Sequence, residues 1–305
     1  MRDRPQYLNP FGYLWEGLKL AARLPGIVGS HRCQITWLER GIMDWGPTLE
    51  PLLKPPLVVD VDDAVFLLPP LGKYGAIIAA KLATLVIAGN QYLANWYSRY
   101  ARDIRIIPTA VDTHRFRPRT KNELKELKEP GNFIIGWTGS ASNLVYLHAI
   151  ESPLRHFLEN YEDTEICVVA NKPPSFKTIP GHRVRFIAWS PEIESEAVRG
   201  MDVGLMPLPD NPWTRGKCSF KMLQYMATGI PAIASPVGMN ADILAMDSLG
   251  LPASTDDDWY EALTYFYVNR DKCIEYGLKG REVAERNYSQ KIISSRLASI
   301  FRELA

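Results

Sequence analysis

The sequence has few cysteines, almost no net charge and no apolar run long enough to cross a membrane. Its four cysteines, Cys33, Cys167, Cys218 and Cys273, form no C-x-x-C pair and have no His-x-x-x-His nearby, which argues against a structural zinc site. Scattered single cysteines are typical of a reducing compartment, so we expect a cytoplasmic protein. The 35 Lys and Arg against 34 Asp and Glu leave a net charge of +1, so we expect no nucleic-acid partner.

Membrane insertion is also not expected. The most apolar stretch, residues 76–88, contains Lys81 and is shorter than the roughly 20 residues that a spanning helix needs. The charged amino terminus is not followed by the apolar core of a signal peptide. Residues 13–23 mix aromatic, leucine and cationic side chains at helical spacing. This pattern is compatible with a peripheral contact at the inner face of a membrane, and packing on the domain is the alternative.

The length and the periodicity predict two α/β domains. A chain of 305 residues suits two domains of about 150 residues. Short apolar runs alternate with helical patterns, which is typical of parallel α/β layers. The predicted strands are residues 34–38, 57–60, 85–88, 104–107, 132–137, 166–170, 184–187, 203–206 and 232–234. The predicted helices are residues 92–100, 143–158, 219–227 and the tail from 256 onward.

Charge-rich residues 119–131 interrupt this alternation and read as a linker or a short solvated helix. We therefore predict an amino-terminal domain at 1–112, a linker at 113–131, a second domain at 132–288 and a terminal helix at 289–305.

The first candidate site is the sequence Gly136-Trp-Thr-Gly-Ser-Ala-Ser-Asn143. A strand ends, a loop of small residues follows, and a helix begins. Small residues let backbone N–H groups approach a phosphate, and a helix amino terminus favours negative charge. A tight turn with Ser140 or Ser142 as the helix cap explains the pattern equally well.

The second candidate site is the stretch 207–238, where a helix begins directly after a cationic loop. Arg215 and Lys217 precede the helix, Lys221 lies in its first turn, and Gly229 is a suitable residue to end it. Cations at a helix amino terminus oppose the helix dipole, and an anion such as a diphosphate would offset that cost. The alternative is that the lysines only extend into solvent.

Beyond these physical arguments, residues 220–238, Phe-Lys-Met-Leu-Gln-Tyr-Met-Ala-Thr-Gly-Ile-Pro-Ala-Ile-Ala-Ser-Pro-Val-Gly, resemble the donor-site helix and following strand of glycosyltransferase family 4. Val111-Asp112, Phe116 and Pro118 resemble the stretch that leaves the family's amino-terminal domain. Ile135-Gly-Trp-Thr-Gly-Ser140 resembles the first strand and loop of its second domain. The likeness covers roughly residues 55–290 and implies the GT-B fold, in which two Rossmann-like α/β domains face a cleft.

The resemblance also implies an activity. Family members are retaining, hexosyltransferase-like glycosyltransferases that use a nucleotide-diphosphate sugar as donor, with no metal and no other cofactor. It implies a glycan or lipid-linked acceptor and a role in polysaccharide or cell-envelope glycan synthesis.

The resemblance assigns roles by position. Lys217, Lys221 and Arg215, with the backbone near Ser219 and Phe220, are expected to hold the diphosphate. Gln224 is expected to contact the ribose, Gly139 and Ser140 to approach the leaving phosphates, and Trp189 to lie at the base.

Two departures from the family pattern matter. The family carries two glutamates eight residues apart, where this chain has Gly216 and Gln224. The cations that many members carry after the first strand of the second domain are replaced by Gly-Ser-Ala-Ser-Asn. The cationic loop and helix must then supply the positive charge.

A third candidate site lies in the first domain, where a strand ends in Asp60, Asp62 and Asp63. Strand alternation predicts that Asp60 and Asp62 share a face, with Asp63 opposite. The resemblance implies an acceptor-side site, in which Asp62 orients or deprotonates the acceptor hydroxyl. Two alternatives remain: aspartates that cap the next helix, and a D-x-D metal site on Asp60 and Asp62.

The first domain reaches its first strand only near Gln34 and is expected to be incomplete or reduced relative to the family. A misplaced start, a fragment and a reduced domain each explain this. The alternatives to an active transferase are a non-catalytic nucleotide-sugar-binding homologue and a metal-dependent transferase that uses Asp60 and Asp62.

Overall fold

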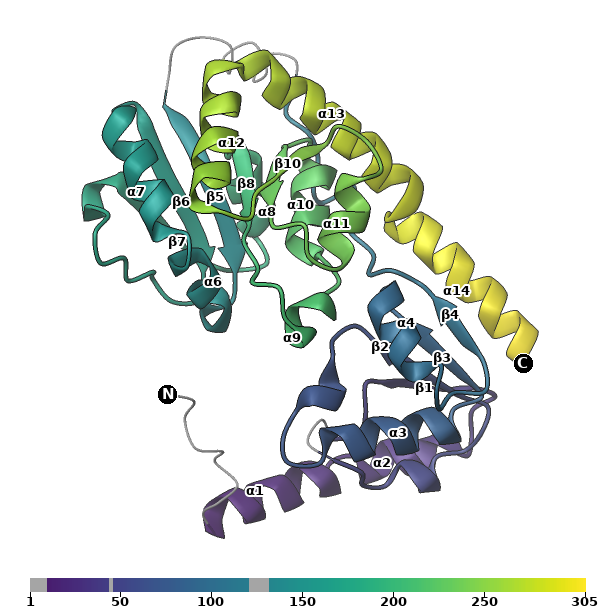
Figure 1. Cartoon of the computed structure of the whole chain (residues 1–305). Coiled ribbons are helices and arrows are strands. Elements are labelled where there is room, and N and C mark those ends of the chain that lie inside the picture. Colours follow the sequence, from purple (N-terminus) through teal and green to yellow (C-terminus); the bar gives the residue numbers. More distant parts are fainter. Residues whose placement is uncertain (1–9, 44–45, 121–131) are drawn as a thin grey trace. The chain divides into compact units, whose positions relative to one another are not determined.

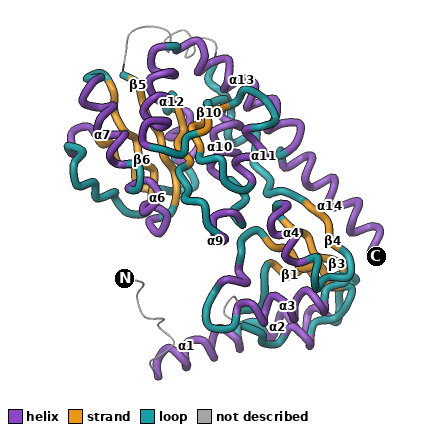
Figure 2. Tube along the Cα trace, viewed as in Figure 1, coloured by secondary structure: helices purple, strands orange, loops and turns teal. Residues whose placement is uncertain are grey.

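The computed structural model describes residues 10–43, 46–120 and 132–305. The chain forms two compact units, each built on a parallel sheet with helices around it (Figures 1 and 2). One unit runs to Pro108 and includes Arg296–Ala305, and the other is Thr109–Ser295. Most of the predicted linker, residues 121–131, lies outside the described residues, as does the charged amino terminus.

The first unit has a four-stranded parallel sheet in the order β1-β2-β3-β4. Its strands are β1 (Thr36–Glu39), β2 (Leu57–Val61), β3 (Leu85–Ala88) and β4 (Ile104–Ile106). Its helices are α1 (Pro10–Ala21), α2 (Leu24–Ser30), η2 (Glu50–Leu52), η3 (Val65–Leu67), α3 (Gly72–Leu82) and α4 (Gln91–Tyr97). Ile300 of α14 (Gln290–Leu304) packs on Val58, Leu85 and Ile87, so the end of the chain covers apolar residues of this sheet.

The second unit has a six-stranded parallel sheet in the order β10-β9-β8-β5-β6-β7. Its strands are β5 (Phe133–Gly139), β6 (Thr164–Ala170), β7 (Val184–Ala188), β8 (Val203–Met206), β9 (Ala232–Ala234) and β10 (Gly250–Pro252). Its helices are η4 (Ala141–Asn143), α6 (Leu144–His148), α7 (Glu151–Asn160), η5 (Gly181–Arg183), α8 (Glu194–Arg199), α9 (Pro212–Arg215), α10 (Phe220–Thr228), α11 (Met239–Leu244), α12 (Asp256–Val268) and α13 (Arg270–Asn287).

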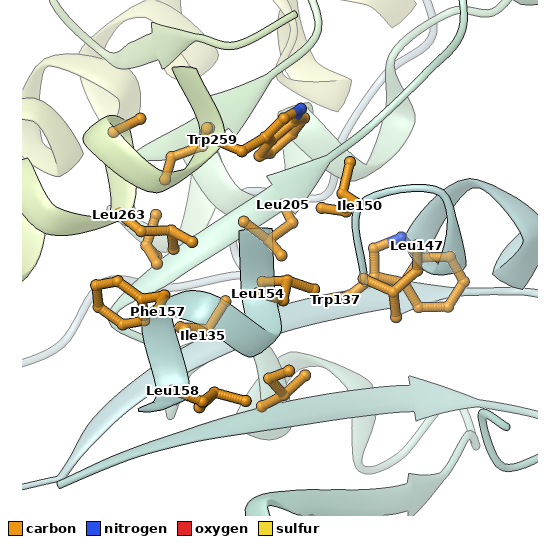
Figure 3. Packing of buried hydrophobic residues seen from close by; sticks show 14 of the residues in the cluster. Ile135, Trp137, Leu147, Ile150, Leu154, Phe157, Leu158, Leu205, Trp259 and Leu263 are labelled. Atoms are coloured by element: carbon orange, nitrogen blue, oxygen red, sulfur yellow. The ribbon is translucent and has the colours of Figure 1, made fainter. Parts of the chain in front are cut away.

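The core of the second unit explains how its helices meet the sheet. Ile135 and Trp137 of β5 pack with residues of α7 and α12 such as Leu154 and Leu263 (Figure 3). Helix α10 approaches strand β8 closely, because β8 carries Gly204 at the point where α10 crosses it. A Cβ atom on Gly204 would lie 2.4 Å from the ring of Tyr225, so the missing side chain lets α10 lie directly on the strand.

The strand order reverses at β5, with β6 on one side and β8 on the other. β5 and β8 pair only at Ile135 and Gly136, and beyond that point a tyrosine joins them. The hydroxyl of Tyr225 accepts from Thr138 N and donates to Leu205 O, both at 3.2 Å. In open α/β sheets, ligands bind at the carboxyl ends of strands where the order reverses. The loops after β5 and β8 are therefore the first place to look for a site.

Some local predictions were wrong. The predicted helix 143–158 is broken into η4, α6 and α7. Pro153 lacks the N–H that a continuous helix would need at this point, so the helix restarts at Glu151. Neither Ser140 nor Ser142 caps a helix, since the Ser140 and Ser142 hydroxyls bond to each other at 2.9 Å. The short strand β10 was not predicted.

Candidate functional site

The amino terminus of α10 is built by a strained serine. Ser219 precedes the helix with a φ of 53°, in the left-handed region that side-chain-bearing residues rarely adopt. Its hydroxyl donates to Asn240 Oδ1 at 2.6 Å and does not cap the helix. Asn240 in turn donates to Ser235 O at 3.0 Å. Because Ser219 is tied away from the helix end, the dipole of α10 has no side-chain cap there.

Lys221 lies against the end of β5. Its ammonium is 5.3 Å from the centre of the Trp137 ring. A Cβ atom on Gly139 would lie 2.6 Å from Lys221 Cε, so the lysine passes directly over this glycine. Lys217 lies 5.5 Å from the centre of the Trp213 ring. The structure thus brings Gly139 and Lys221 together at the switch point of the sheet.

The other residues predicted to bind the donor sugar nucleotide differ in their partners and in their exposure. Arg215 binds Asp210 through two hydrogen bonds of 2.6 and 2.9 Å in an exposed ion pair, so its charge is balanced locally. Ser140 follows β5 and its Oγ accepts from Asn143 Nδ2 at 3.0 Å. Phe220 and Trp189, which follows β7, are 45% and 44% exposed.

Gln224 is buried beside a carboxylate. It is 2% exposed, and its Nε2 donates to Glu194 Oε1 at 3.0 Å. The other oxygen of Glu194 accepts from Arg115 Nη2 at 2.9 Å. The sequence reasoning missed Glu194 and Arg115, because their partners lie far along the chain. It also gave no role to Trp137, although that residue directly precedes the predicted phosphate loop.

In the first unit, Asp62 and Asp63 share one partner. Arg40 donates to Asp62 through two bonds of 2.7 and 3.0 Å, and to Asp63 at 3.4 Å. The prediction that Asp62 and Asp63 lie on opposite faces was wrong, because β2 ends at Val61 and strand alternation does not continue. Helix capping was also wrong, since η3 begins after Ala64 with no side-chain cap.

Asp60 is the perturbed carboxyl group of this cluster. Burial raises its pKa to about 6, and the negative charges of Asp62 and Glu39 act in the same direction. A hydrogen bond from Trp37 and the charge of Arg40 partly oppose that rise. In the part of the chain that the structure describes, no group of three or more His, Cys, Asp or Glu is arranged to hold a metal ion.

A cavity of about 770 Å³ adjoins this cluster. Glu39 and Arg40 line it together with apolar side chains such as Ile27, Leu38 and Leu53. It therefore offers charged groups and apolar surface in one space of small-ligand size.

All four cysteines are free thiols, with Cys33 exposed and the others buried. Within the described ranges, no helix combines the length and the apolar character that crossing a bilayer requires.

Comparison with known proteins yields structural likeness only. No protein-family model matches the sequence, and no curated protein matches it. Among solved structures, sucrose-phosphate synthase from Thermosynechococcus elongatus superposes with a TM-score of 0.70 at 15% identity, covering 92% of this chain and 76% of the other. HepE of Anabaena in complex with UDP-glucose gives 0.68 at 13%, covering 92% and 82%. WaaG, a glycosyltransferase involved in lipopolysaccharide biosynthesis, gives 0.63 at 14%, covering 87% and 77%.

These likenesses agree with the two parallel α/β units. The predicted fold class is confirmed: the chain has the two-unit GT-B fold of glycosyltransferases.

Proposed function

We propose that the chain is a glycosyltransferase that moves a sugar from a nucleotide-diphosphate sugar to an acceptor hydroxyl. The observation that carries this proposal is the position of Lys221, which lies over Trp137 and against Gly139 at the switch point of the second sheet. The amino terminus of α10, which has no side-chain cap, lies one residue away. A cation and a helix dipole at one point are suited to a diphosphate.

The same groups suit the chemistry of transfer. When the glycosidic bond to the donor breaks, negative charge develops on the leaving diphosphate. Lys221, Lys217 and the N–H groups of α10 would stabilise that charge because they are in place before the bond breaks. The proposed reaction retains the anomeric configuration, as the family resemblance implies.

The proposed donor is a UDP-sugar, with no metal required. HepE, which shares the fold, was solved with UDP-glucose. We assign the diphosphate to Lys217 and Lys221, the ribose to Gln224, and the base to the exposed ring of Trp189, which offers a stacking surface.

For the acceptor we propose the cavity of the first unit, which is lined by Arg40, the hydrogen-bond partner of Asp62. Its mixed lining suits a molecule with both polar and apolar parts, such as a glycan carried on a lipid, and this would place the enzyme in cell-envelope or polysaccharide synthesis. Asp62→Asn should then reduce sugar transfer while leaving UDP affinity unchanged. A loss of UDP affinity in that variant would contradict the assignment.

We further propose that α1 and α2 rest on the inner face of an anionic membrane. Trp15, Leu18, Leu24 and Val28 are large apolar residues that are each about half exposed or more, and Lys19 and Arg23 accompany them in sequence. Sedimentation with vesicles of phosphatidylglycerol and phosphatidylcholine tests this contact. No co-sedimentation at low salt would rule it out.

The decisive experiment for the donor site is thermal unfolding of the chain with UDP, GDP, ADP, CMP and their sugar conjugates, with and without Mg²⁺. A ligand at 100 times its dissociation constant stabilises by about 2.7 kcal/mol, which raises the unfolding midpoint by several degrees. Lys221→Met should reduce the rise by about half or more, and Lys177→Met, a change at an exposed lysine of the same unit, should leave it unchanged. No shift with any nucleotide would refute the donor site, and binding without turnover would favour the non-catalytic alternative.

A further inference from the structure

A buried carboxylate fixes the orientation of the Gln224 amide. Gln224 Nε2 donates to Glu194 Oε1 at 3.0 Å, and the two residues are 2% and 8% exposed. A carboxylate only accepts hydrogen bonds, whereas an amide has one donor end and one acceptor end. Glu194 therefore holds the NH₂ end, and the carbonyl oxygen Oε1 of Gln224 must face the other way.

That carbonyl oxygen is not sealed inside the protein. In the described part of the chain, the buried side-chain atoms that lack any partner are Tyr97 Oη and Thr264 Oγ1, and Gln224 Oε1 is not among them. The one hydrogen bond recorded there for the Gln224 side chain is made through Nε2. Its oxygen therefore keeps a small contact with the surroundings of the protein, although the residue as a whole is only 2% exposed.

The position of Gln224 on α10 indicates which donor this is. Residues three apart on a helix are neighbours on one face, about 5–6 Å apart at their Cβ atoms, and Gln224 follows Lys221 by three. If Lys221 holds the diphosphate, the next group of a nucleotide along the helix is the ribose. Ribose hydroxyls are hydrogen-bond donors, which match an acceptor oxygen.

An arginine strap fixes Glu194 from behind. We use this name for residues 111–119, in which three alternate residues are arginines that bind α8 and the turn after it. Arg115 pairs with Glu194 at 2.9 Å and also donates to Pro191 O. Arg117 pairs with Glu196 at 3.4 Å. Arg119 pairs with Asp202 at 3.1 Å and donates to the carbonyls of Arg199, the last residue of α8, and of Met201 in the turn after it.

The strap gives the buried Glu194 carboxylate the cation that it needs, since an unpaired buried charge is strongly unfavourable. It also ties down Pro191, in the loop that carries Trp189. One arginine therefore positions the partner of Gln224 and the loop assigned to the base.

We propose that Glu194 is a positioning residue for ribose recognition: it orients Gln224 so that Oε1 accepts from a ribose hydroxyl, and Arg115 holds Glu194 in place. This inference rests on the proposed donor site. Glu194 would not itself bind the nucleotide, because it acts through Gln224.

The test compares UDP with 2′,3′-dideoxy-UDP by isothermal titration calorimetry of the full chain. Wild type should bind UDP about tenfold more tightly, because a hydrogen bond of this kind contributes roughly that factor. Glu194→Gln no longer fixes the orientation of the Gln224 side-chain amide, because an amide at position 194 can accept or donate. The preference for UDP should therefore disappear, while dideoxy-UDP binds as before. Glu196→Gln, on the same helix and in an exposed pair, is the matched control and should keep the preference.

The swap E194Q/Q224E provides the rescue. The amide at position 194 can accept from Arg115 and donate to a carboxylate at position 224, which again presents an acceptor to the ribose. The double variant should regain the preference for UDP. If Glu194 had only a structural role, the swap would not be expected to restore that preference. If Glu194→Gln fails to fold, the swap decides alone.

The outcomes separate the two proposals. Three results would overturn the role of Glu194 and leave the donor site standing. Glu194→Gln could keep the preference for UDP, wild type could lack that preference, or the swap could fail to restore it. If wild type binds neither UDP, ADP nor GDP, the donor site itself fails and this inference fails with it.

Discussion

Gly139→Ala should weaken nucleotide binding because it displaces Lys221. The added Cβ would lie 2.6 Å from Lys221 Cε and 2.8 Å from Trp137 Cη2, and carbon atoms are not tolerated at such distances. Trp137 is 1% exposed and cannot move without disturbing the core. The lysine has a flexible side chain and is partly exposed, so the lysine moves.

The size of the effect follows from what Lys221 does. A hydrogen bond between charged groups contributes about 1.5–3 kcal/mol, which corresponds to a loss of affinity of about 10- to 150-fold. Alanine at the φ of Gly139, +159°, also strains the backbone by about 1 kcal/mol or more. The melting temperature must therefore be measured beside the affinity for UDP.

A double-mutant cycle isolates the mechanism. Lys221→Met should cost as much affinity as Gly139→Ala or more, and the double variant should lose little beyond Lys221→Met alone. Gly181→Ala is the matched glycine control, since a Cβ there meets no atom within 4 Å. Additive losses would show that the alanine acts without Lys221, and unchanged UDP affinity in Lys221→Met would refute the site.

Three further predictions concern stability and the base. Asp60 has a folded pKa near 6, raised from 3.8; the native state therefore binds more protons between about pH 4 and 6, and stability falls as pH rises through that window. Asp60→Asn should remove this fall and stabilise the protein by up to about 3 kcal/mol at pH 7.5. Urea unfolding of both proteins at pH 4.5 and 7.5 measures the difference. A variant that is less stable than wild type at pH 7.5 would contradict the prediction. Gly277→Ala places a Cβ 2.0 Å from Gly229 O and should destabilise by about 2 kcal/mol or more, whereas Gly200→Ala, with its nearest atom at 3.5 Å, should not; equal melting temperatures would contradict this. Trp189→Ala should weaken UDP binding by about 1–3 kcal/mol through lost base stacking, and calorimetry that finds equal affinity would remove Trp189 from the site.

Most strands of both sheets could be predicted from the sequence, most clearly the central ones, because central strands of a parallel sheet are buried on both faces. Such strands appear as short continuous apolar runs, as in β3 and β8, whose residues are all buried. β10 could not be found in this way, since Gly250-Leu-Pro252 has three residues and one of them is proline. Its pairing with β9 is a property of the folded sheet.

The local structure around the proposed donor site could be predicted in part. The end of α10 at Gly229 follows from local chemistry, and its left-handed conformation is confirmed. The pairing of Arg40 with Asp62 and Asp63 was not predictable, because it depends on a left-handed arginine in another loop. Local patterns specify local geometry, and contacts between distant segments require the fold.

The cations that we propose for the diphosphate contact different kinds of side chain. A tryptophan face attracts an ammonium through its ring quadrupole and adds no formal negative charge. Lys217 and Lys221 each lie over such a face, and the ring contact positions the ammonium without bringing a carboxylate of its own. Arg215 is bound by the carboxylate of Asp210, and an arriving phosphate would have to displace that partner or meet its repulsion. In the donor site that we propose, the positive charge that the sequence lacks after β5 comes from α10 and the loop before it, where aromatic rings position it.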